Sequence, residues 1–269
     1  MANIVKTESG IDLLQRLSVR PKLIGLQTEV FGENGPQPGD VIEISEKNTN
    51  LKTVLLTQWI IRCILPSIWK GIKIGGLEVG VVFLSTDHHF SLLNLVTVLE
   101  RTLKRNLRQY HELLPASGIS IVEEIVKDSL KRLSVYESFN KTELLFNFCS
   151  TKTYILSHPK SSVVMLDSLS AFYWEDRLSA STMQSLDKYC QSLLLCLIEK
   201  LKQTNITIIY TVQQFLRESH ERESAEDQLL IYSLSLENES QTMIHIEDRR
   251  NAKKFSKKIE ILKGDLLIK

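Results

Sequence analysis

The sequence feature that most limits the possible folds is a short apolar run that ends in an acid. Val163 to Leu166 are four consecutive apolar residues, and Asp167 follows them directly. An apolar run of this length, preceded by a turn at residues 158–161, is typical of a parallel strand that is buried on both faces. Open parallel sheets bind their ligands at the carboxyl ends of such strands. Asp167 is therefore a candidate magnesium ligand beside a nucleotide, or it only caps the following loop or helix.

Strands and helices alternate along the rest of the chain. Further buried strands are predicted at Val79 to Leu84 and Ile206 to Thr211, and short strands at Val41 to Ile44 and Leu133 to Tyr136. Helical spacing predicts helices at Thr53 to Leu65, Phe90 to Leu107, Ile119 to Leu133 and Lys141 to Leu156, and a long helix up to Leu201 behind a capping pair, Ser181 and Gln184. Terminal strands are predicted at Met243 to Asp248, Ile259 to Leu262 and Leu266 to Ile268. This order indicates an α/β fold with a mostly parallel central sheet flanked by helices, and antiparallel strands near the C-terminus.

The domain organisation follows from the absence of a dividing linker. No segment rich in Pro, Gly and Ser interrupts the 269 residues. We therefore assign residues 39–269 to one domain and residues 1–38 to an N-terminal extension. Apolar residues between Ile11 and Leu17 predict one short helix in that extension.

Charge and cysteine content exclude several classes of protein. The 33 Lys and Arg against 32 Asp and Glu leave a net charge of +1, which gives no general affinity for nucleic acid. The four cysteines form no CxxC pair, so we expect reduced intracellular thiols rather than disulfides or a zinc site. The most apolar window, Val54 to Pro66, is shorter than the roughly 20 residues that a membrane helix needs. We expect a soluble protein of the cytosol or nucleus without membrane contact.

A strand, a loop and a helix meet at residues 42–56, IEISEKNTNLKTVLL. Lys52 and Thr53 stand where the phosphate-binding motif GxxxxGK[ST] has its Lys and Ser or Thr, which meet phosphate and Mg²⁺. Glu46 and Leu51 replace the two glycines of that motif. A side chain at Leu51 crowds a phosphate, and Glu46 adds a negative charge. The residues favour a degenerate site for ATP and Mg²⁺, and Lys52 either meets phosphate or is a solvated lysine at the start of a helix.

Four segments carry a more specific signal. They are residues 7–17 (TESGIDLLQRL), 62–66 (RCILP), 75–100 (GGLEVGVVFLSTDHHFSLLNLVTVLE) and 166–177 (LDSLSAFYWEDR). Together they resemble the paralogues of the eukaryotic RecA-like recombinase, and the last segment is the most specific. The resemblance covers about the first two thirds of the chain and is slight beyond Thr211.

The resemblance implies a RecA-like P-loop ATPase core and assigns roles to single residues. Lys52 and Thr53 fall on the phosphate-loop pair, and Asp167 falls on the acid that binds Mg²⁺ together with Thr53. Asp87 falls where recombinases carry the glutamate that activates water, and Gln213 falls on a sensor glutamine. ATP and Mg²⁺ are the cofactors that these positions imply.

The resemblance also implies partners and a cellular role. It implies a nuclear DNA repair protein that belongs to a four-subunit complex of recombinase paralogues and docks chiefly to the D paralogue. Such a complex acts in homologous recombination repair of double-strand breaks, in replication-fork protection and in meiosis, and this subunit would reach DNA through the complex.

Two hypotheses about activity follow. One is a non-catalytic or weakly nucleotide-binding subunit, and the alternative is an active DNA-stimulated ATPase of the RecA family. The missing glycines and the shorter reach of Asp87 compared with Glu favour the first. The segment Phe215 to Gln228, in the place of a DNA-binding loop, is net acidic, which suits single-stranded DNA poorly.

Three further groups of residues have open roles. The basic run contains six cations that contact DNA phosphates or a partner, form a nuclear localisation signal, or belong to a solvated hairpin: Arg249, Arg250, Lys253, Lys254, Lys257 and Lys258. Arg101, Lys104, Arg105 and Arg108 form a basic helix face for DNA or an acidic partner, or are ordinary exposed charges. Phe172, Tyr173 and Trp174 are a partner anchor or part of the core. His88 and His89 lack the neighbours of a zinc site.

Overall fold

The computed structural model describes Gly10 and residues 19–47, 51–108, 118–179, 184–213, 230–238, 241–262 and 265–269. The short helix predicted from Ile11 to Leu17 lies outside the described residues, and so does the acidic segment Phe215 to Gln228.

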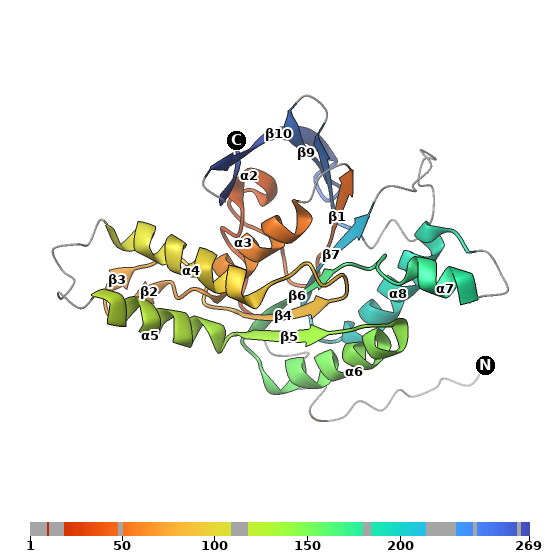
Figure 1. Cartoon of the computed structure of the whole chain (residues 1–269), viewed down its shortest axis with the longest axis horizontal. Coiled ribbons are helices and arrows are strands. Elements are labelled where there is room, and N and C mark those ends of the chain that lie inside the picture. Colours follow the sequence, from red (N-terminus) through yellow and green to blue (C-terminus); the bar gives the residue numbers. More distant parts are fainter. Residues whose placement is uncertain are drawn as a thin grey trace.

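One sheet organises the described part of the chain (Figure 1). Within those residues nine strands pair in the order β11-β10-β9-β8-β1-β7-β6-β4-β5. Their bounds are Val41–Lys47 (β1), Gly80–Ser85 (β4), Leu133–Glu137 (β5), Ser161–Asp167 (β6), Thr207–Gln213 (β7), Tyr232–Asn238 (β8), Thr242–Asp248 (β9), Lys253–Leu262 (β10) and Asp265–Ile268 (β11). The strands from β8 to β5 pair in parallel, and those from β8 to β11 pair antiparallel. The predicted mostly parallel sheet with antiparallel C-terminal strands is confirmed. A separate small hairpin joins Ile68–Trp69 (β2) and Ile72–Lys73 (β3).

Helices cover both faces of this sheet. They are Thr28–Phe31 (α2), Lys52–Ile64 (α3), Leu92–Leu107 (α4), Gly118–Leu130 (α5), Lys141–Ser157 (α6), Tyr173–Ser179 (α7) and Leu186–Leu201 (α8). Val81 and Phe83 of β4 pack in one apolar cluster with α3, α4 and α5, whereas Val82 and Leu84 pack in the other with α6 and α8. Successive strand residues point to opposite faces, which explains why a strand covered on both faces is continuously apolar. No helix in the described part of the chain combines the length and apolar character that crossing a membrane requires.

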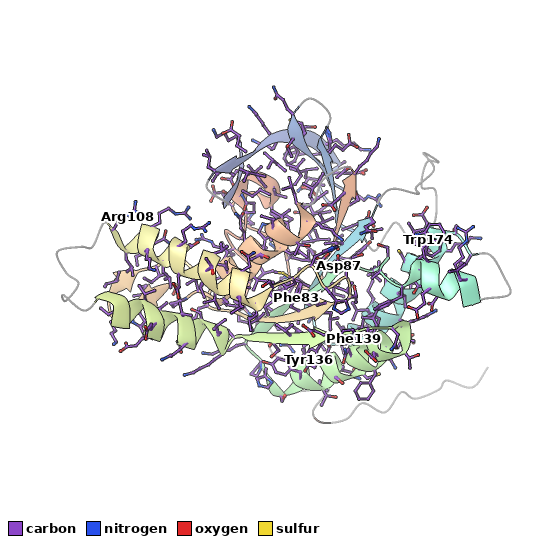
Figure 2. The ribbon with its side chains drawn as sticks, in the orientation of Figure 1. Phe83, Asp87, Arg108, Tyr136, Phe139 and Trp174 are labelled. Carbon is purple, nitrogen blue, oxygen red and sulfur yellow. The ribbon has the colours of Figure 1, made fainter. Side chains whose placement is uncertain are left out.

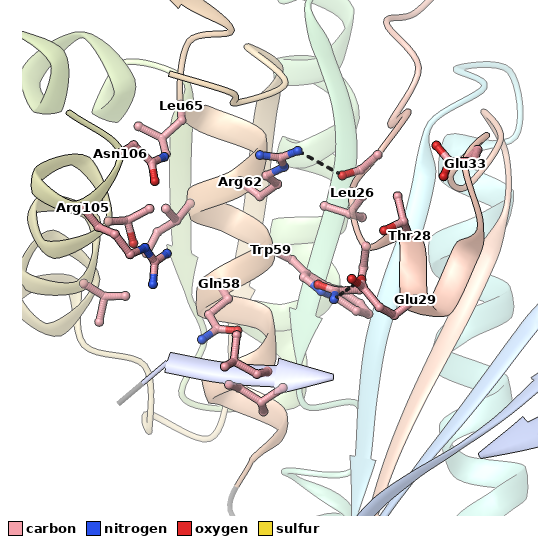
Figure 3. Close-up of a pocket in the computed structure, with 17 residues that line it drawn as sticks. Leu26, Thr28, Glu29, Glu33, Gln58, Trp59, Arg62, Leu65, Arg105 and Asn106 are labelled. Carbon is pink, nitrogen blue, oxygen red and sulfur yellow. Dashed lines mark hydrogen bonds between the residues drawn. The ribbon is translucent and has the colours of Figure 1, made fainter. Parts of the chain in front are cut away.

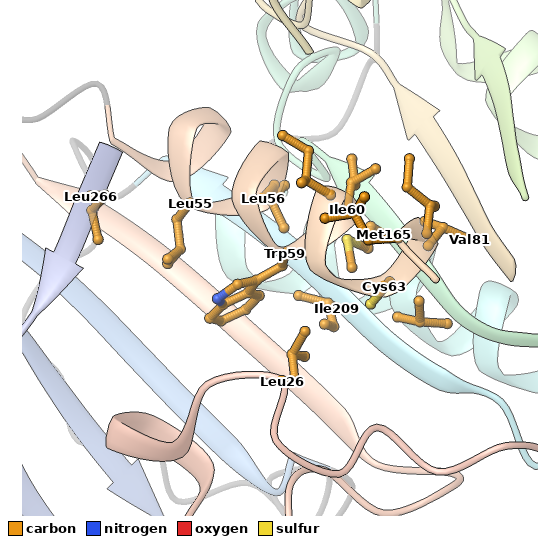
Figure 4. Close-up of a cluster of buried hydrophobic side chains, with 14 of the residues drawn as sticks. Leu26, Leu55, Leu56, Trp59, Ile60, Cys63, Val81, Met165, Ile209 and Leu266 are labelled. Atoms are coloured by element: carbon orange, nitrogen blue, oxygen red, sulfur yellow. The ribbon is translucent and has the colours of Figure 1, made fainter. Parts of the chain in front are cut away.

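Helix α3 lies at the centre of the first cluster (Figure 4). Its buried apolar side chains point to several sides of the helix and include Leu55, Leu56, Trp59, Ile60, Cys63 and Ile64. The helix ends before Pro66, because a residue that precedes proline disfavours the helical conformation, and Leu65 is extended with a ψ of 142°. Packing on all sides fixes α3, so its first residue, Lys52, has a defined place at the edge of the sheet.

Part of the segment before β1 also belongs to this core. Leu23, Leu26, Val30 and Phe31 are buried in the cluster that contains α3. The ring of Phe31 lies 5.3 Å from that of Trp59. Residues 23–31 therefore pack on the same core as the main domain, and the division at residue 38 stays a prediction.

Several local predictions are wrong. Strand β8 was not predicted, because its buried residues Tyr232, Leu234 and Leu236 alternate with half-buried ones instead of forming an apolar run. Helix α7 was not predicted either. The cap of α8 is Ser185, whose hydroxyl accepts a hydrogen bond from the Lys188 N–H at 3.4 Å, and the predicted capping residue Ser181 lies outside the described residues.

The cysteines differ in their surroundings, and this leads to a prediction. Burial in α3 raises the pKa of the Cys63 thiol to about 12, whereas Cys149 on α6 is exposed. We expect iodoacetamide at about pH 8 to label Cys149 and to leave Cys63 unmodified, because the thiolate is the reactive form. Peptide mass spectrometry of native and unfolded protein measures this. Equal labelling of both thiols in the native protein would contradict the described core.

Candidate functional site

Neighbouring strands bring the predicted nucleotide-site residues to one edge of the sheet. The register of β1 and β7 places Glu46 beside Gln213. Asp167 is the last residue of β6, and Asp87 lies two residues beyond β4 (Figure 2). Lys52 begins α3. Parallel strands end at the same edge, so the structure brings these residues together, while their roles stay predictions.

Lys52 lies inside a cluster of carboxylates. Its side chain is 4% exposed, and its Nζ lies 2.7 Å from Asp87 Oδ2 and 3.5 Å from Asp167 Oδ1. The alternative of a solvated lysine at the start of a helix is therefore wrong. The ammonium is already neutralised by acids of this chain. These acids supply the negative charge that a nucleotide would otherwise supply.

Asp167 is fully buried and accepts hydrogen bonds on both oxygens. Thr53 Oγ1 donates to Asp167 Oδ2 at 2.6 Å, and the Thr211 hydroxyl donates to Oδ1. The sequence analysis did not include Thr211, although its place near the end of a predicted strand was a usable signal. Thr53 and Asp167, the two residues predicted to bind Mg²⁺, are thus hydrogen-bonded to each other.

The pKa values of the cluster show how its charge is shared. Burial, with a smaller contribution from the charge of Asp87, raises the pKa of Asp167 in spite of Lys52 and the two hydroxyl donors. Burial also acts to raise the pKa of Asp87, but the Lys52 ammonium and hydrogen bonds from Lys52 and His89 outweigh it and lower this pKa. Burial acts to lower the pKa of Lys52, and attraction to Asp167 and Asp87 reverses this and raises it. The ion pair is Lys52 with Asp87, and Asp167 is the first of these two acids to bind a proton as the pH falls.

Glu46 occupies the start of α3. Its Oε2 accepts hydrogen bonds from the N–H groups of Leu51 at 2.9 Å and Lys52 at 3.0 Å. These are the first free N–H groups of the helix, which bind phosphate in a phosphate loop. The sequence analysis treated Glu46 only as an unfavourable charge and missed that it binds these groups.

ATP with Mg²⁺ does not fit these residues as they stand. A carboxylate takes the anion position at the start of α3, and the ammonium that would meet a phosphate is paired with Asp87. The hydroxyl that would meet Mg²⁺ donates to Asp167. A nucleotide would have to displace each of these contacts.

Comparison with known proteins gives the family. No family model matches the chain. The DNA repair protein XRCC2 of Mus musculus is 33% identical over 212 residues, which cover 78% of this chain and 69% of that protein. The chain belongs to the XRCC2 family of DNA repair proteins. An XRCC2 homolog of Arabidopsis thaliana is 31% identical over 163 residues, which cover 53% of this chain and 44% of that protein. Membership of the XRCC2 family confirms the resemblance to recombinase paralogues.

A solved structure confirms the fold of this XRCC2-family chain. The crystal structure of the RadB recombinase matches it with a TM-score of 0.60 and 17% sequence identity. The match covers 90% of this chain and 96% of the RadB chain. The predicted RecA-like fold is therefore confirmed, and at this identity the likeness concerns the fold alone.

Hydrogen bonds between side chains and backbone connect the strand ends at the edge of the sheet where the candidate site lies. The hydroxyl of Thr86 donates to the Ser168 carbonyl at 2.7 Å and thereby joins the ends of β4 and β6. The N–H of Gln213, the predicted sensor residue, donates to Ser170 Oγ at 3.1 Å. The sequence analysis missed Thr86 and Ser170, because nothing in their local sequence indicates what they bond.

The basic run does not form one positive surface. Its residues fall in the β9–β10 hairpin and on β10, where Lys253 and Lys257 lie on one face and Lys254 and Lys258 on the other. Acids accompany several of its cations: Arg250 binds Asp40, Lys254 lies 3.1 Å from Glu247, Lys258 lies 3.4 Å from Glu260, and Arg249 lies 3.8 Å from Glu247. A role for these six residues in contacting DNA or a partner stays a prediction.

The basic face of α4 is exposed as predicted, and one of its residues borders a pocket. Arg101, Lys104, Arg105 and Arg108 are all exposed. A pocket of about 570 Å³ lies between α2, α3, α4 and β11, and Arg62 and Arg105 line it together with Glu29 and Glu33 (Figure 3). The lining therefore carries charges of both signs.

The remaining candidates divide between core and surface. Phe172 and Tyr173 are buried, whereas Trp174 on α7 is half exposed and lies under the guanidinium of Arg177 at 5.2 Å (Figure 2). Only Trp174 is thus available as an anchor for a partner. Among the described residues there is no group of three His, Cys, Asp or Glu side chains that could bind a metal ion.

Proposed function

We propose that this XRCC2-family chain is a non-catalytic, or at most weakly nucleotide-binding, subunit of a recombinase-paralogue complex in homologous recombination. The observation that carries the proposal is the pairing of Lys52 with Asp87 in a buried cluster. An ATPase needs the lysine free for phosphate and the acid free to activate water. Here each group neutralises the other, and the RecA-like fold remains as a scaffold.

The same proposal extends to partners and place. The chain docks chiefly to the D paralogue within a four-subunit complex, contacts DNA through that complex, and acts in the nucleus. Its processes are repair of double-strand breaks, replication-fork protection and meiosis. Family membership and the RecA-like fold support this reading. Coexpression with the D paralogue should yield a stoichiometric complex, and a chain that stays monomeric under those conditions would count against the proposal.

The alternative is an active DNA-stimulated ATPase that uses Lys52, Thr53, Asp87 and Asp167. Asp87→Asn separates the two, because asparagine still accepts a hydrogen bond from Lys52 but cannot act as a base. We expect the variant to be less stable, because the buried Lys52 loses a charged partner, and to leave ATP hydrolysis per amount of folded complex unchanged. An active site would lose roughly 100-fold or more in rate.

Glu124→Gln is the control for this experiment. Glu124 is an exposed acid that pairs with Lys70 at 2.7 Å, far in sequence from the site. Rates are compared per amount of folded protein, which thermal unfolding reports. Hydrolysis that disappears with Asp87→Asn and persists with Glu124→Gln would establish the ATPase and end the present proposal.

A further inference from the structure

The anion-binding end of α3 is filled by a side chain of the same chain. A single oxygen, Glu46 Oε2, accepts the N–H groups of both Leu51 and Lys52. Leu51, the residue that precedes the helix, supplies no side-chain cap, and the first turn contains no acid of its own. Glu46 is therefore the group that satisfies these two donors, and it satisfies them with a negative charge, as a phosphate does.

We propose that Glu46 is the specificity-determining residue of this site and that its carboxylate stands permanently in place of a nucleotide phosphate. The inference rests on the proposed function, because it names the group that closes a site which does not turn over ATP.

The position of Glu46 in the sheet keeps its carboxylate in the place of a phosphate. Glu46 lies in β1, paired with Gln213 of β7 on one side and with Leu236 of β8 on the other. It is 3% exposed. Strand pairing on both sides fixes the backbone of Glu46, and its side chain is buried beside the start of α3, so an entering phosphate would meet the carboxylate at contact distance, where like charges repel.

The charge of Lys52 completes the arrangement. One carboxylate at the start of α3 carries less charge than a triphosphate. Two further carboxylates pair with the ammonium of Lys52, Asp87 at 2.7 Å and Asp167 at 3.5 Å. The three acids together supply the negative charge that nucleotide supplies in a functional site. The start of α3 is thus stabilised without ligand.

The test measures pyrophosphate binding to the full-length chain by calorimetric titration. Glu46→Gly restores the first glycine of the motif and frees the two N–H groups. Glu46→Gln keeps the size of the side chain and removes its charge. We expect weak binding to the wild type, an affinity about tenfold or more higher in Glu46→Gly, and a smaller gain in Glu46→Gln. Amide hydrogen exchange at Leu51 and Lys52 should become faster in Glu46→Gly, because these groups lose their acceptor.

Glu43→Gln is the matched control. Glu43 is a buried acid on the same strand, and its carboxylate accepts a hydrogen bond from the Tyr210 hydroxyl at 2.8 Å. It should leave pyrophosphate binding unchanged. If Glu46→Gly does not fold, Glu46→Gln decides the outcome.

Two results would overturn the inference. One is pyrophosphate binding by the wild type as tight as that of the Glu46 variants. The other is a folded Glu46 variant that gains no affinity and keeps slow exchange at Leu51 and Lys52. The second result would leave the non-catalytic function intact, since that function fails only if hydrolysis depends on Asp87.

Discussion

Replacing Lys52 with methionine is expected to lower the free energy of unfolding by about 3–5 kcal/mol, the range observed when one partner of a buried ion pair is removed. Methionine approximates the volume of lysine, so the loss comes from the charges left behind. Asp87 would keep a buried carboxylate without its ammonium, and Asp167 would lose its only nearby cation among the described residues. Urea unfolding followed by circular dichroism measures the change.

Lys70→Met provides the matched control for this prediction. Lys70 pairs with Glu124 at the same 2.7 Å, but both side chains are about half exposed or more. An exposed pair contributes roughly 1 kcal/mol or less, because water solvates each partner alone. Equal effects of the two substitutions would show that the Lys52 cluster is not a buried ion pair. A loss of repair in Lys52 variants would therefore be explained first by lower stability of the protein, and only after that by a loss of catalysis.

Replacing Arg20 with alanine is expected to lower the free energy of unfolding by about 2–4 kcal/mol, because buried carbonyls would lose a charged donor. The Arg20 guanidinium is buried and donates to the carbonyls of Thr204 at 2.6 Å, Ser161 at 2.8 Å and Ile155 at 3.3 Å. It thereby ties the segment before α2 to the ends of α6 and α8 and to the start of β6. Urea unfolding measures the change.

Lys22→Ala is the comparison for Arg20. Lys22 is two residues further along the same segment and is exposed, so its removal should change stability by less than about 0.5 kcal/mol. If Arg20→Ala unfolds at the same urea concentration as Lys22→Ala, Arg20 does not anchor the segment.

Much of the fold could be predicted because its elements have local signatures. Apolar runs mark β4, β6 and β7, and strands covered by helices on both faces are expected to have such runs. The strand β8 lacks such a run, since its buried residues alternate with half-buried ones, and it was found only in the structure. Helix α7 was likewise missed, because its seven residues are too few for a helical period to stand out.

Several residues of the candidate site could be predicted from the sequence, but their hydrogen bonds and ion pairs could not. Lys52, Asp87 and Asp167 each follow from the end of a strand or the start of a helix. Thr211 and the acceptor role of Glu46 do not, because they depend on which groups face each other across the edge of the sheet. The carboxylate of Glu46 accepts a hydrogen bond from the backbone N–H of Lys52, six positions further along the chain.

By itself, the sequence determined where most strands and helices form and that Lys52, Asp87 and Asp167 lie at the carboxyl edge of the sheet, because periodicity and strand ends are properties of short segments. Only the tertiary structure decided that the lysine of the phosphate loop is neutralised by this chain's own acids. That pairing depends on distances from Lys52 to Asp87 and to Asp167, which lie 35 and 115 positions further along the chain, and the order of strands in the sheet sets those distances.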